Sequence, residues 1–469
     1  MQQRTLLVAL SLAFAGCATI APPAVPDAAG ISVPVAWNAS ADSRRESTDL
    51  ASWWKRFDDP TLTTLIERAL AANTELASAQ AALRQARALD AVQRARLGPT
   101  LAASASVQRG KSGSGSASNL FQAGFDASWE PDVFGGQGAG VQASSADVQA
   151  SSATLGDVLV SIAAEVAGTY IGLRGSQTRL VIANDNLASQ QETLQITQWR
   201  VQAGLATSLD AEQARNAVEQ TRAQLPALAT SIAQARHAIA LLTGQTAGEL
   251  HLPDSLRSGL AVVPQPGDDL ALAFPADTLR QRADVRGAEA KARAAAARVV
   301  QADAARLPSF SLSGSLGLSA LTLGGLGSSD AFARSILGGL SATLFDGSAL
   351  KAQVQAQQAG FDQAVASYRG TTLTALKDVE DALVALRNDR QRLATLRSAA
   401  EAADNAALLA RQRYTSGLVD FQTVLTTQRT QLSSQDSVAS ATADLATDHV
   451  RLYKALGGGW TPSTGAKPA

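Results

Sequence analysis

The sequence predicts an α+β membrane protein in which long helices are combined with a few membrane-crossing strands. Three observations lead to this class: proline-free stretches with heptad repeats, short segments in which apolar and polar residues alternate, and a duplication of both within the chain. The chain has 469 residues, a formal net charge of −1 and 4% aromatic residues. This composition suits evenly packed helices and gives no indication of a nucleic-acid partner.

Residues 1–16 have the features of a signal peptide. Arg4 precedes an apolar run that ends at Ala15, and this run is too short to span a bilayer. Cys17 is the only cysteine, which excludes an internal disulfide. "FAGC" resembles a bacterial lipobox, although Phe14 stands where leucine is usual, so we expect cleavage before Cys17 and lipid attachment there. Ala18 after the cysteine implies sorting to the outer membrane. The alternative is a chance thiol.

The segment after the cysteine, residues 17–59, is rich in proline and alanine and is expected to be an extended, lipidated tether. Regular structure should begin near "SWWKRFDDPTLTTLIERAL", where apolar residues recur at helical spacing: Leu62, Leu65, Ile66 and Leu70.

The chain contains an internal duplication with an offset of 213 residues. The pattern R-x-x-x-G-L occurs at residues 200–205 and again at 413–418, and "VQA" occurs at 141–143 and at 354–356. Convergent helical composition could produce one such match, but not a constant register over about sixty residues. We therefore expect two repeats. The expected division is 60–250 and 272–460 for the repeats, 251–271 for the linker and 461–469 for a flexible tail.

Each repeat contains one very long predicted helix, at about 136–202 and about 347–415. At 1.5 Å per residue each helix would be about 100 Å long. Both have apolar residues at heptad spacing, as in a coiled coil. The first repeat has Val141, Val148, Leu155 and Ile162, then Leu159, Val166, Leu173 and Leu180; the second has Val354, Phe361 and Tyr368, then Val379, Leu386 and Leu393. An ordinary coiled-coil spacer is the alternative.

A predicted hairpin precedes each long helix. "LFQAGFDASWE" and "SFSLSGSLGLS" alternate apolar and polar residues over about ten positions, as a tilted membrane strand with one apolar face does. The expected strands are at about 100–109, 120–130, 309–319 and 336–345. Four strands cannot close a barrel, and an open edge in lipid is very costly, so the chain must oligomerise. Two copies give eight strands and a filled interior, whereas three give twelve and a conduit.

The chain resembles the TolC-like outer-membrane factor family, in particular its NodT-type lipidated efflux members. The motifs that carry the resemblance, in order, are "WWKRFDDPTLTTLIERAL", "RLGPTLAASAS", "WEPDVFGG", the first R-x-x-x-G-L turn, "RLPSFSLSGS", "LFDGS" and the second turn. The resemblance implies a homotrimer whose twelve-stranded outer-membrane β-barrel, four strands per chain, is continuous with a periplasmic α-helical barrel. It also implies a belt of mixed structure around the helices, for which 228–275 and the C-terminal region are candidates.

The resemblance also implies partners and a function. The partners would be a periplasmic adaptor and an inner-membrane pump of the resistance-nodulation-division type. The channel would passively conduct small molecules such as drugs out of the cell. The alternative within the same fold is the outer-membrane conduit of a type I polypeptide secretion system.

In such an architecture the paired turns lie at the periplasmic tip and face the adaptor. The tip candidates are Arg200, Gly204, Leu205, Arg413, Gly417 and Leu418. Both glycines are expected to have positive φ and to end their helices.

The aperture candidates follow from the turns: Asp210, Tyr414, Asp420, Phe421, Thr423 and Thr426. Relatives often carry aspartate at the position of Thr426, so a carboxylate ring cannot form there. Asp210 and Asp420 either form acidic rings that favour cations or are N-caps. The Tyr414 hydroxyl is expected to bond between helix pairs, and Arg413 to meet one of the two aspartates. A hydrophobic constriction is the alternative, at Leu418, Phe421 and Leu425.

The sequence offers no catalytic site, metal site or cofactor site. Three histidines and one N-terminal cysteine form no nucleophile–base or metal-binding pattern, and no glycine-rich phosphate loop follows a strand. "SGSGS" at 112–116 is expected to be a loop tip, and Asp132 and Asp346 to cap helices. A periplasmic adaptor is disfavoured because no lipoyl-like β-domain flanks a single helical hairpin.

Overall fold

The computed structural model describes residues 20–38, 50–111, 113, 116–250, 262–267 and 275–461. The signal peptide and Cys17, with the lipid attachment expected there, lie outside the described residues. The chain divides into two compact units. The first is formed by 1–31, 81–153 and 286–371, and the second by 32–80, 154–285 and 372–469.

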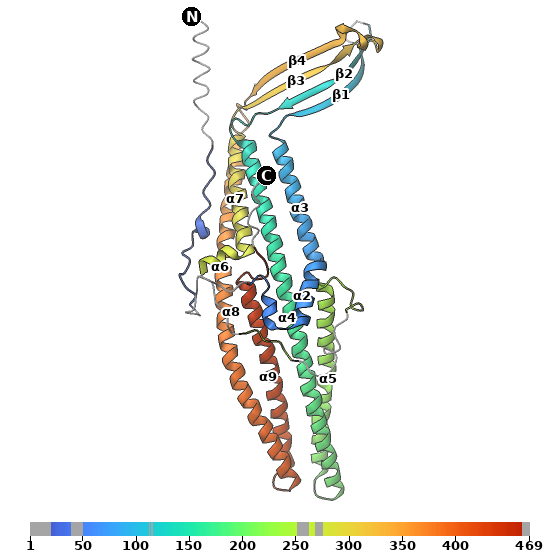
Figure 1. Ribbon diagram of the computed structural model, residues 1–469, viewed down its shortest axis with the longest axis vertical. Coiled ribbons are helices and arrows are strands. Elements are labelled where there is room, and N and C mark those ends of the chain that lie inside the picture. Colours follow the sequence, from blue (N-terminus) through green and yellow to red (C-terminus); the bar gives the residue numbers. More distant parts are fainter. Residues whose placement is uncertain are drawn as a thin grey trace. The chain divides into compact units, whose positions relative to one another are not determined.

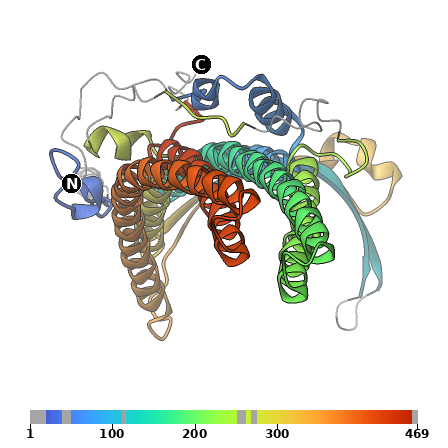
Figure 2. The same ribbon diagram turned by 90° about the horizontal axis from the view of Figure 1, so that it is seen from below.

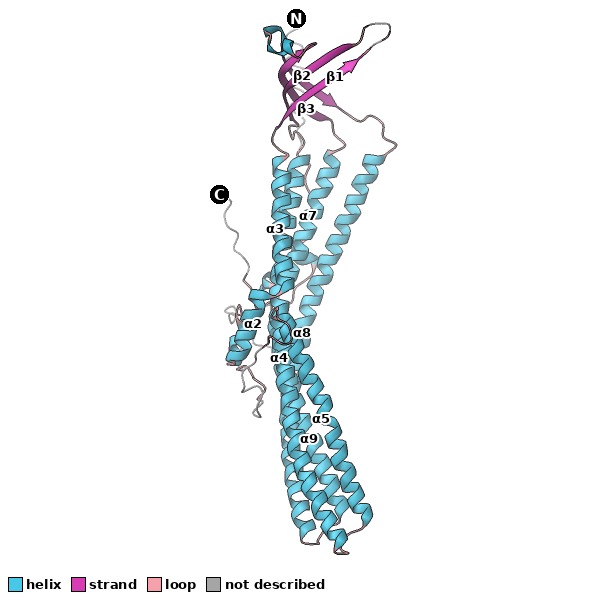
Figure 3. Cartoon of the chain, turned by 90° about the vertical axis from the view of Figure 1, so that its right-hand side faces the viewer, coloured by secondary structure: helices cyan, strands magenta, loops and turns pink. Residues whose placement is uncertain are grey.

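The first unit contains a four-stranded antiparallel sheet, drawn in magenta in Figure 3. The strand order is β1-β2-β3-β4. The strands are β1 (Thr100–Gly110), β2 (Ser118–Trp129), β3 (Ser309–Ala320) and β4 (Phe332–Ser341). Four helices contribute segments to this unit: α3 (Thr74–Ala95), α4 (Gly136–Gln202), α7 (Ala283–Ala304) and α8 (Ala349–Thr415). Short 3-10 turns are also present: η1 (Asp27–Gly30), η4 (Gly324–Gly327) and η5 (Ser329–Ala331).

The strand register gathers most of the large apolar residues of the four strands on one face. Val107 lies opposite Phe121, Phe125 opposite Leu316, and Phe310 opposite Leu340. Because successive residues of a strand point to opposite faces, this face consists of the odd-numbered residues of β1 and β2 and the even-numbered residues of β3 and β4. We call it the apolar face of the sheet. The opposite face is mostly polar, with Leu120 and Leu337 as the large apolar exceptions.

The prediction for the fourth strand is wrong in position. The strand was expected at 336–345 but occupies Phe332–Ser341. The reason is its pairing with β3, since Ser309, the first residue of β3, lies opposite Ser341 and later residues would have no partner. Leu344 and Phe345, which extended the alternating pattern, are more than nine-tenths exposed beyond the strand.

Both long helices begin at aspartate caps, as the sequence predicts. The Asp132 carboxylate accepts hydrogen bonds from the backbone N–H groups of Gln137 and Gly138 at the start of α4. The Asp346 carboxylate accepts from Ser348 and Leu350 at the start of α8, and these bonds, that to Leu350 above all, lower the pKa of Asp346. Such caps satisfy backbone donors that have no partner within the helix.

The second unit is helical. It contains α2 (Pro60–Ala72), α5 (Ser208–Leu242), α6 (Pro275–Gln281), α9 (Phe421–Ala455), the 3-10 turn η2 (Trp53–Phe57), and segments of α4 and α8 (Figure 1). The heptad residues Val166, Leu173 and Val379 are fully buried in its core. Aromatic residues of η2 and α9 complete that core, because the Trp53 and Tyr453 ring centroids lie 5.2 Å apart.

Candidate functional site: the paired helix turns

Two tight turns join α4 to α5 and α8 to α9, and Figure 2 shows them side by side. Gly204 has φ 70° and Gly417 has φ 74°, so the expected positive φ is confirmed at both glycines. The N–H of Leu205 donates to the Arg200 carbonyl at 2.7 Å, and the N–H of Leu418 donates to the Arg413 carbonyl at 2.8 Å. These are Schellman caps, for which glycine is suited because it has no Cβ.

Both candidate aspartates take part in the caps of the helices that follow the turns. The Thr207 hydroxyl accepts from the Asp210 N–H at 3.2 Å and the Asp210 carboxylate accepts from the Thr207 N–H at 2.9 Å, which makes a capping box. The Asp420 carboxylate accepts from the Thr423 hydroxyl and, at 2.8 Å, from the Thr423 N–H. The hydroxyl bond above all lowers the pKa of Asp420. Asp420 is therefore the N-cap of α9, as expected, whereas the N-cap of α5 is Thr207 and Asp210 is the acidic partner in its capping box.

Behind the turns lies a small hydrophobic cluster, which we call the tip cluster. Its members are Ala214, Ala217, Ala410, Tyr414, Phe421, Val424 and Leu425. The Tyr414 and Phe421 rings pack edge to face with centroids 5.8 Å apart, and both residues are about 95% buried. Phe421 and Leu425 are thus held between helices of the same chain, whereas Leu418 is 74% exposed. Thr423 and Thr426 are also exposed.

The link between the two turns differs from the one expected. The Tyr414 hydroxyl is buried and has no hydrogen-bond partner in the described part of the chain. Instead Arg200 of α4 donates from Nη1 to the Tyr414 backbone carbonyl at 2.6 Å, and its guanidinium lies 4.3 Å from the Tyr414 ring centroid. Arg413 forms no ion pair with Asp210 or Asp420, both of which are described and bind their own helix ends.

The duplication could have indicated this asymmetry. Tyr414 corresponds to Val201 in the first repeat, so an aromatic ring at this position occurs in the second turn only. Arg200 therefore has a cation–π partner across the pair, whereas the matching ring is missing for Arg413.

A polar seam joins α4 to α9 above the tip cluster, and the heptad pattern did not indicate it. Gln428 donates to the Thr193 hydroxyl at 2.9 Å, and Arg179 makes a two-pronged ion pair with Asp436 at 2.6 and 3.1 Å. Further along, Asn186 donates to Gln435 at 2.8 Å, and Gln435 donates to Asp404 of α8 at 2.7 Å. The Arg179–Asp436 pair is partly exposed, whereas the Gln428–Thr193 bond is buried and costly to leave unmade.

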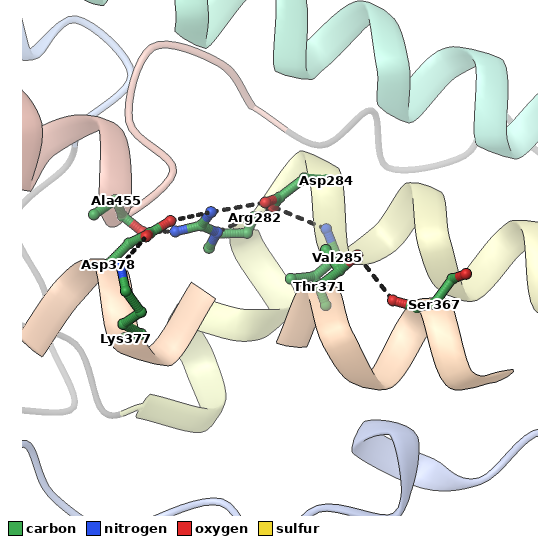
Figure 4. Close-up of polar contacts among 8 residues, drawn as sticks. All are labelled: Arg282, Asp284, Val285, Ser367, Thr371, Lys377, Asp378 and Ala455. Atoms are coloured by element: carbon green, nitrogen blue, oxygen red, sulfur yellow. Dashed lines mark hydrogen bonds and ion pairs between the residues drawn. The ribbon is translucent and has the colours of Figure 1, made fainter. Parts of the chain in front are cut away.

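A second polar cluster lies where α6 ends (Figure 4). Arg282 is 8% exposed, pairs with Asp284 at 2.7 Å and Asp378 at 3.4 Å, and donates to the Ala455 carbonyl at 2.8 Å. Burial lowers the pKa of Arg282, but the bond to Asp284 and the nearby carboxylates more than offset it. The cluster borders a cavity of about 350 Å³. It ties the start of α7 to α8 and to the end of α9, which makes it a structural element.

A sheet with one apolar face joined to helices of 67 residues defines a class of protein: a membrane channel with a long helical extension. The comparisons with known proteins identify the family. The chain belongs to the outer membrane efflux protein family, which matches it twice, at residues 65–245 and 274–458. Both matches fall within the two repeats expected from the sequence. The expected resemblance is confirmed, and the family consists of channels, not of enzymes.

Individual relatives match over nearly the whole chain. The pyoverdine export outer membrane protein OpmQ of Pseudomonas aeruginosa is 32% identical, with 92% of each chain covered. The toluene efflux pump outer membrane protein TtgI of Pseudomonas putida is 31% identical, with 99% of this chain and 100% of TtgI covered. The structure of the outer-membrane channel OprN superposes with a TM-score of 0.88 at 34% identity, covering 95% of this chain and 100% of OprN.

Proposed function

We propose that the chain is the outer-membrane component of a tripartite efflux system and that it forms a homotrimer. The proposed channel conducts small molecules passively from a periplasmic pump–adaptor complex to the outside. The observation that carries this proposal is the sheet, which combines one apolar face with two outer strands, β1 and β4, that pair on one side only. The names of the relatives OpmQ and TtgI, which refer to pyoverdine export and toluene efflux, support the small-molecule class.

The number of copies follows from the strands. The outer edges of β1 and β4 are costly in lipid unless they pair with another chain. Eight strands from two copies leave room only for side chains, whereas twelve from three copies enclose a passage. A closed ring of three identical chains satisfies every edge, which is the usual outcome of head-to-tail symmetry.

Cys17 is proposed as a lipid attachment site that adds an anchor to the barrel. One acyl chain holds a protein only weakly, whereas several together hold it firmly. The belt around the helices is proposed to come from 228–275 and the C-terminal region, with 251–271 joining the repeats. A periplasmic adaptor and a pump of the resistance-nodulation-division type are the proposed partners.

The proposed gate lies at the turns. The exposed side chains nearest to them, those of Leu418, Asp420, Thr423 and Thr426, are the candidates to line the aperture. The contact of Arg200 with Tyr414 holds α4 to α8 and so favours the closed arrangement. An adaptor that binds a more open arrangement better would shift the population towards it.

The test is conduction by the purified, full-length protein in a planar bilayer. The proposal predicts small, stable conductance steps in the closed state and larger ones when the helix pairs are loosened. A protein that inserts no channel under conditions where its strands are folded, as judged by circular dichroism, would exclude a conduit.

A further inference from the structure

Two arginines interrupt the apolar face of the sheet. They are Arg109 on β1 and Arg334 on β4, and they are the only charged residues that the four fully described strands place on this face. Both side chains are exposed, and neither forms an ion pair with a described residue. The only charged residue on the opposite face of the strands is an acid, Asp126. The cations are thus confined to the side that lipid would cover.

Each arginine lies near the hairpin end of its own strand. Arg109 is the last residue but one of β1 and Arg334 is the third of β4, so each is within about 7 Å of the hairpin end of its strand. The strand residues at the helix end of this face include Trp129, Phe310 and Leu340, and none is charged. The cost of a lipid-facing arginine is large at mid-bilayer and small near the interface. The guanidinium groups therefore lie near a headgroup layer.

A groove lies on the apolar face beside Arg334. It has a volume of about 760 Å³, and its apolar lining is Leu101, Phe125, Ala127, Gly314, Leu316 and Ile336. Gly314 pairs with Ala127 on one side and with Ile336 on the other, so two small residues form the floor between larger neighbours. Arg334 lies opposite Leu316, one step closer to the hairpin end than Gly314. The groove is therefore apolar towards the helices and cationic towards the hairpins.

We propose that this groove binds a phosphate-bearing lipid of the outer leaflet. Its acyl chain lies over Gly314 and Ala127, and its headgroup phosphate contacts Arg334. A guanidinium suits this role because it can donate two parallel hydrogen bonds to a phosphate. Arg109, near the hairpin end of β1, is a second cation on the same face, six residues beyond Ala103, which the register aligns with Arg334. In a Gram-negative outer leaflet this lipid is the phosphorylated glycolipid lipid A. The inference rests on the proposed function, which directs the hairpins outward.

The acidic residue nearest to Arg334 in the sequence does not neutralise it. Asp330, in η5 before β4, is exposed and forms no ion pair with Arg334. The guanidinium is thus available to a ligand approaching from the apolar face.

The experiment measures lipid retention by the full-length protein in detergent, using native mass spectrometry. The probes are diphosphoryl lipid A and the same glycolipid with its phosphates removed. We expect about tenfold tighter binding of the phosphorylated form. Arg334→Gln should lose most of this preference, Arg334→Lys should keep most of it, and Arg109→Gln should reduce it a few-fold. The matched control, Lys351→Gln, removes an exposed cation from the first turn of α8 and should change nothing.

Two results would overturn the inference. Equal binding of both glycolipids, or unchanged binding by Arg334→Gln, would mean that the arginine only extends towards water. Displacement of the lipid by millimolar inorganic phosphate would mean a site for soluble anions. The oligomer mass from the same spectra separates this failure from failure of the proposed function. An intact oligomer without lipid preference contradicts only the lipid site, whereas a monomer contradicts the channel.

Discussion

Replacing Arg200 with methionine should loosen the proposed gate. Methionine keeps an apolar stem of similar length but removes both the hydrogen bond to the Tyr414 carbonyl and the cation over the ring. A hydrogen bond from a charged donor contributes about 1.5 kcal/mol at the lower end of its range, which suits the half-buried Arg200. The cation–π contact adds about 0.5 to 1 kcal/mol. The total is about 2 kcal/mol per chain, or a shift of about thirtyfold in the closed–open equilibrium.

The matched control is Arg411→Met. Arg411 of α8 pairs with Glu192 of α4 at 3.0 Å. It therefore links the same two helices, but the arginine belongs to α8 and its partner to α4. That pair is substantially exposed and should contribute only about 0 to 1 kcal/mol. Tyr414→Phe is a second control, because the hydroxyl that it removes has no partner in the described part of the chain.

The assay is single-channel recording of the full-length protein in planar bilayers. We expect Arg200→Met to raise the open fraction strongly, and Arg411→Met and Tyr414→Phe to change it little. An effect of Arg411→Met as large as that of Arg200→Met would refute the importance of the buried contact. A strong effect of Tyr414→Phe would instead support the hydrogen bond between helix pairs that the sequence predicted for the Tyr414 hydroxyl.

Two further predictions concern the anchor and the helix pair. Cys17→Ser should abolish metabolic labelling with palmitate while the protein still fractionates with the outer membrane, and unmodified Cys17 in the mature wild-type protein would contradict lipidation. Asp448 should make stability depend on pH, because burial, and next the neighbouring Asp389, raise its pKa from 3.8 to about 6. A raised folded-state pKa stabilises the protonated protein below pH 4, and this contribution is lost as the pH rises through 6. Moving from pH 7.5 to 5.5 should therefore stabilise the wild type by about 1 kcal/mol per chain relative to Asp448→Asn, as measured by thermal unfolding; parallel pH profiles would disprove it.

The long elements could be predicted because their patterns are set by local periodicity. Val166 and Val379 occupy heptad positions and are fully buried, and the alternation around Phe125 and Leu316 matches the strand register. The position of β4 was mispredicted because apolar and polar residues also alternate in "LGGLSATLF". Only the pairing of Ser309 with Ser341 decides where the strand ends.

The contacts of the candidate site could be predicted only in part. The positive φ of Gly204 and Gly417 follows from the local preference of helix ends, so the turns were recognisable. The partner of Arg200 lies 214 residues away, and nothing in the local sequence specifies which of two similar arginines reaches a carbonyl. The groove beside Arg334 likewise requires the register that brings Gly314 next to Ala127.

A closed twelve-stranded barrel requires β4 of one chain to pair with β1 of the next, and cysteine cross-linking tests this pairing. Cysteine at position 105 of β1 can be combined in turn with cysteine at 334, 336, 338 or 340 of β4, in a Cys17→Ser background that has no other thiol. After oxidation in native membranes, we expect at least one pair to give covalent species of two and three chains and none larger, with a native mass of three chains in detergent. Monomers at every position, or a ladder that continues beyond three chains, would contradict a closed twelve-stranded barrel.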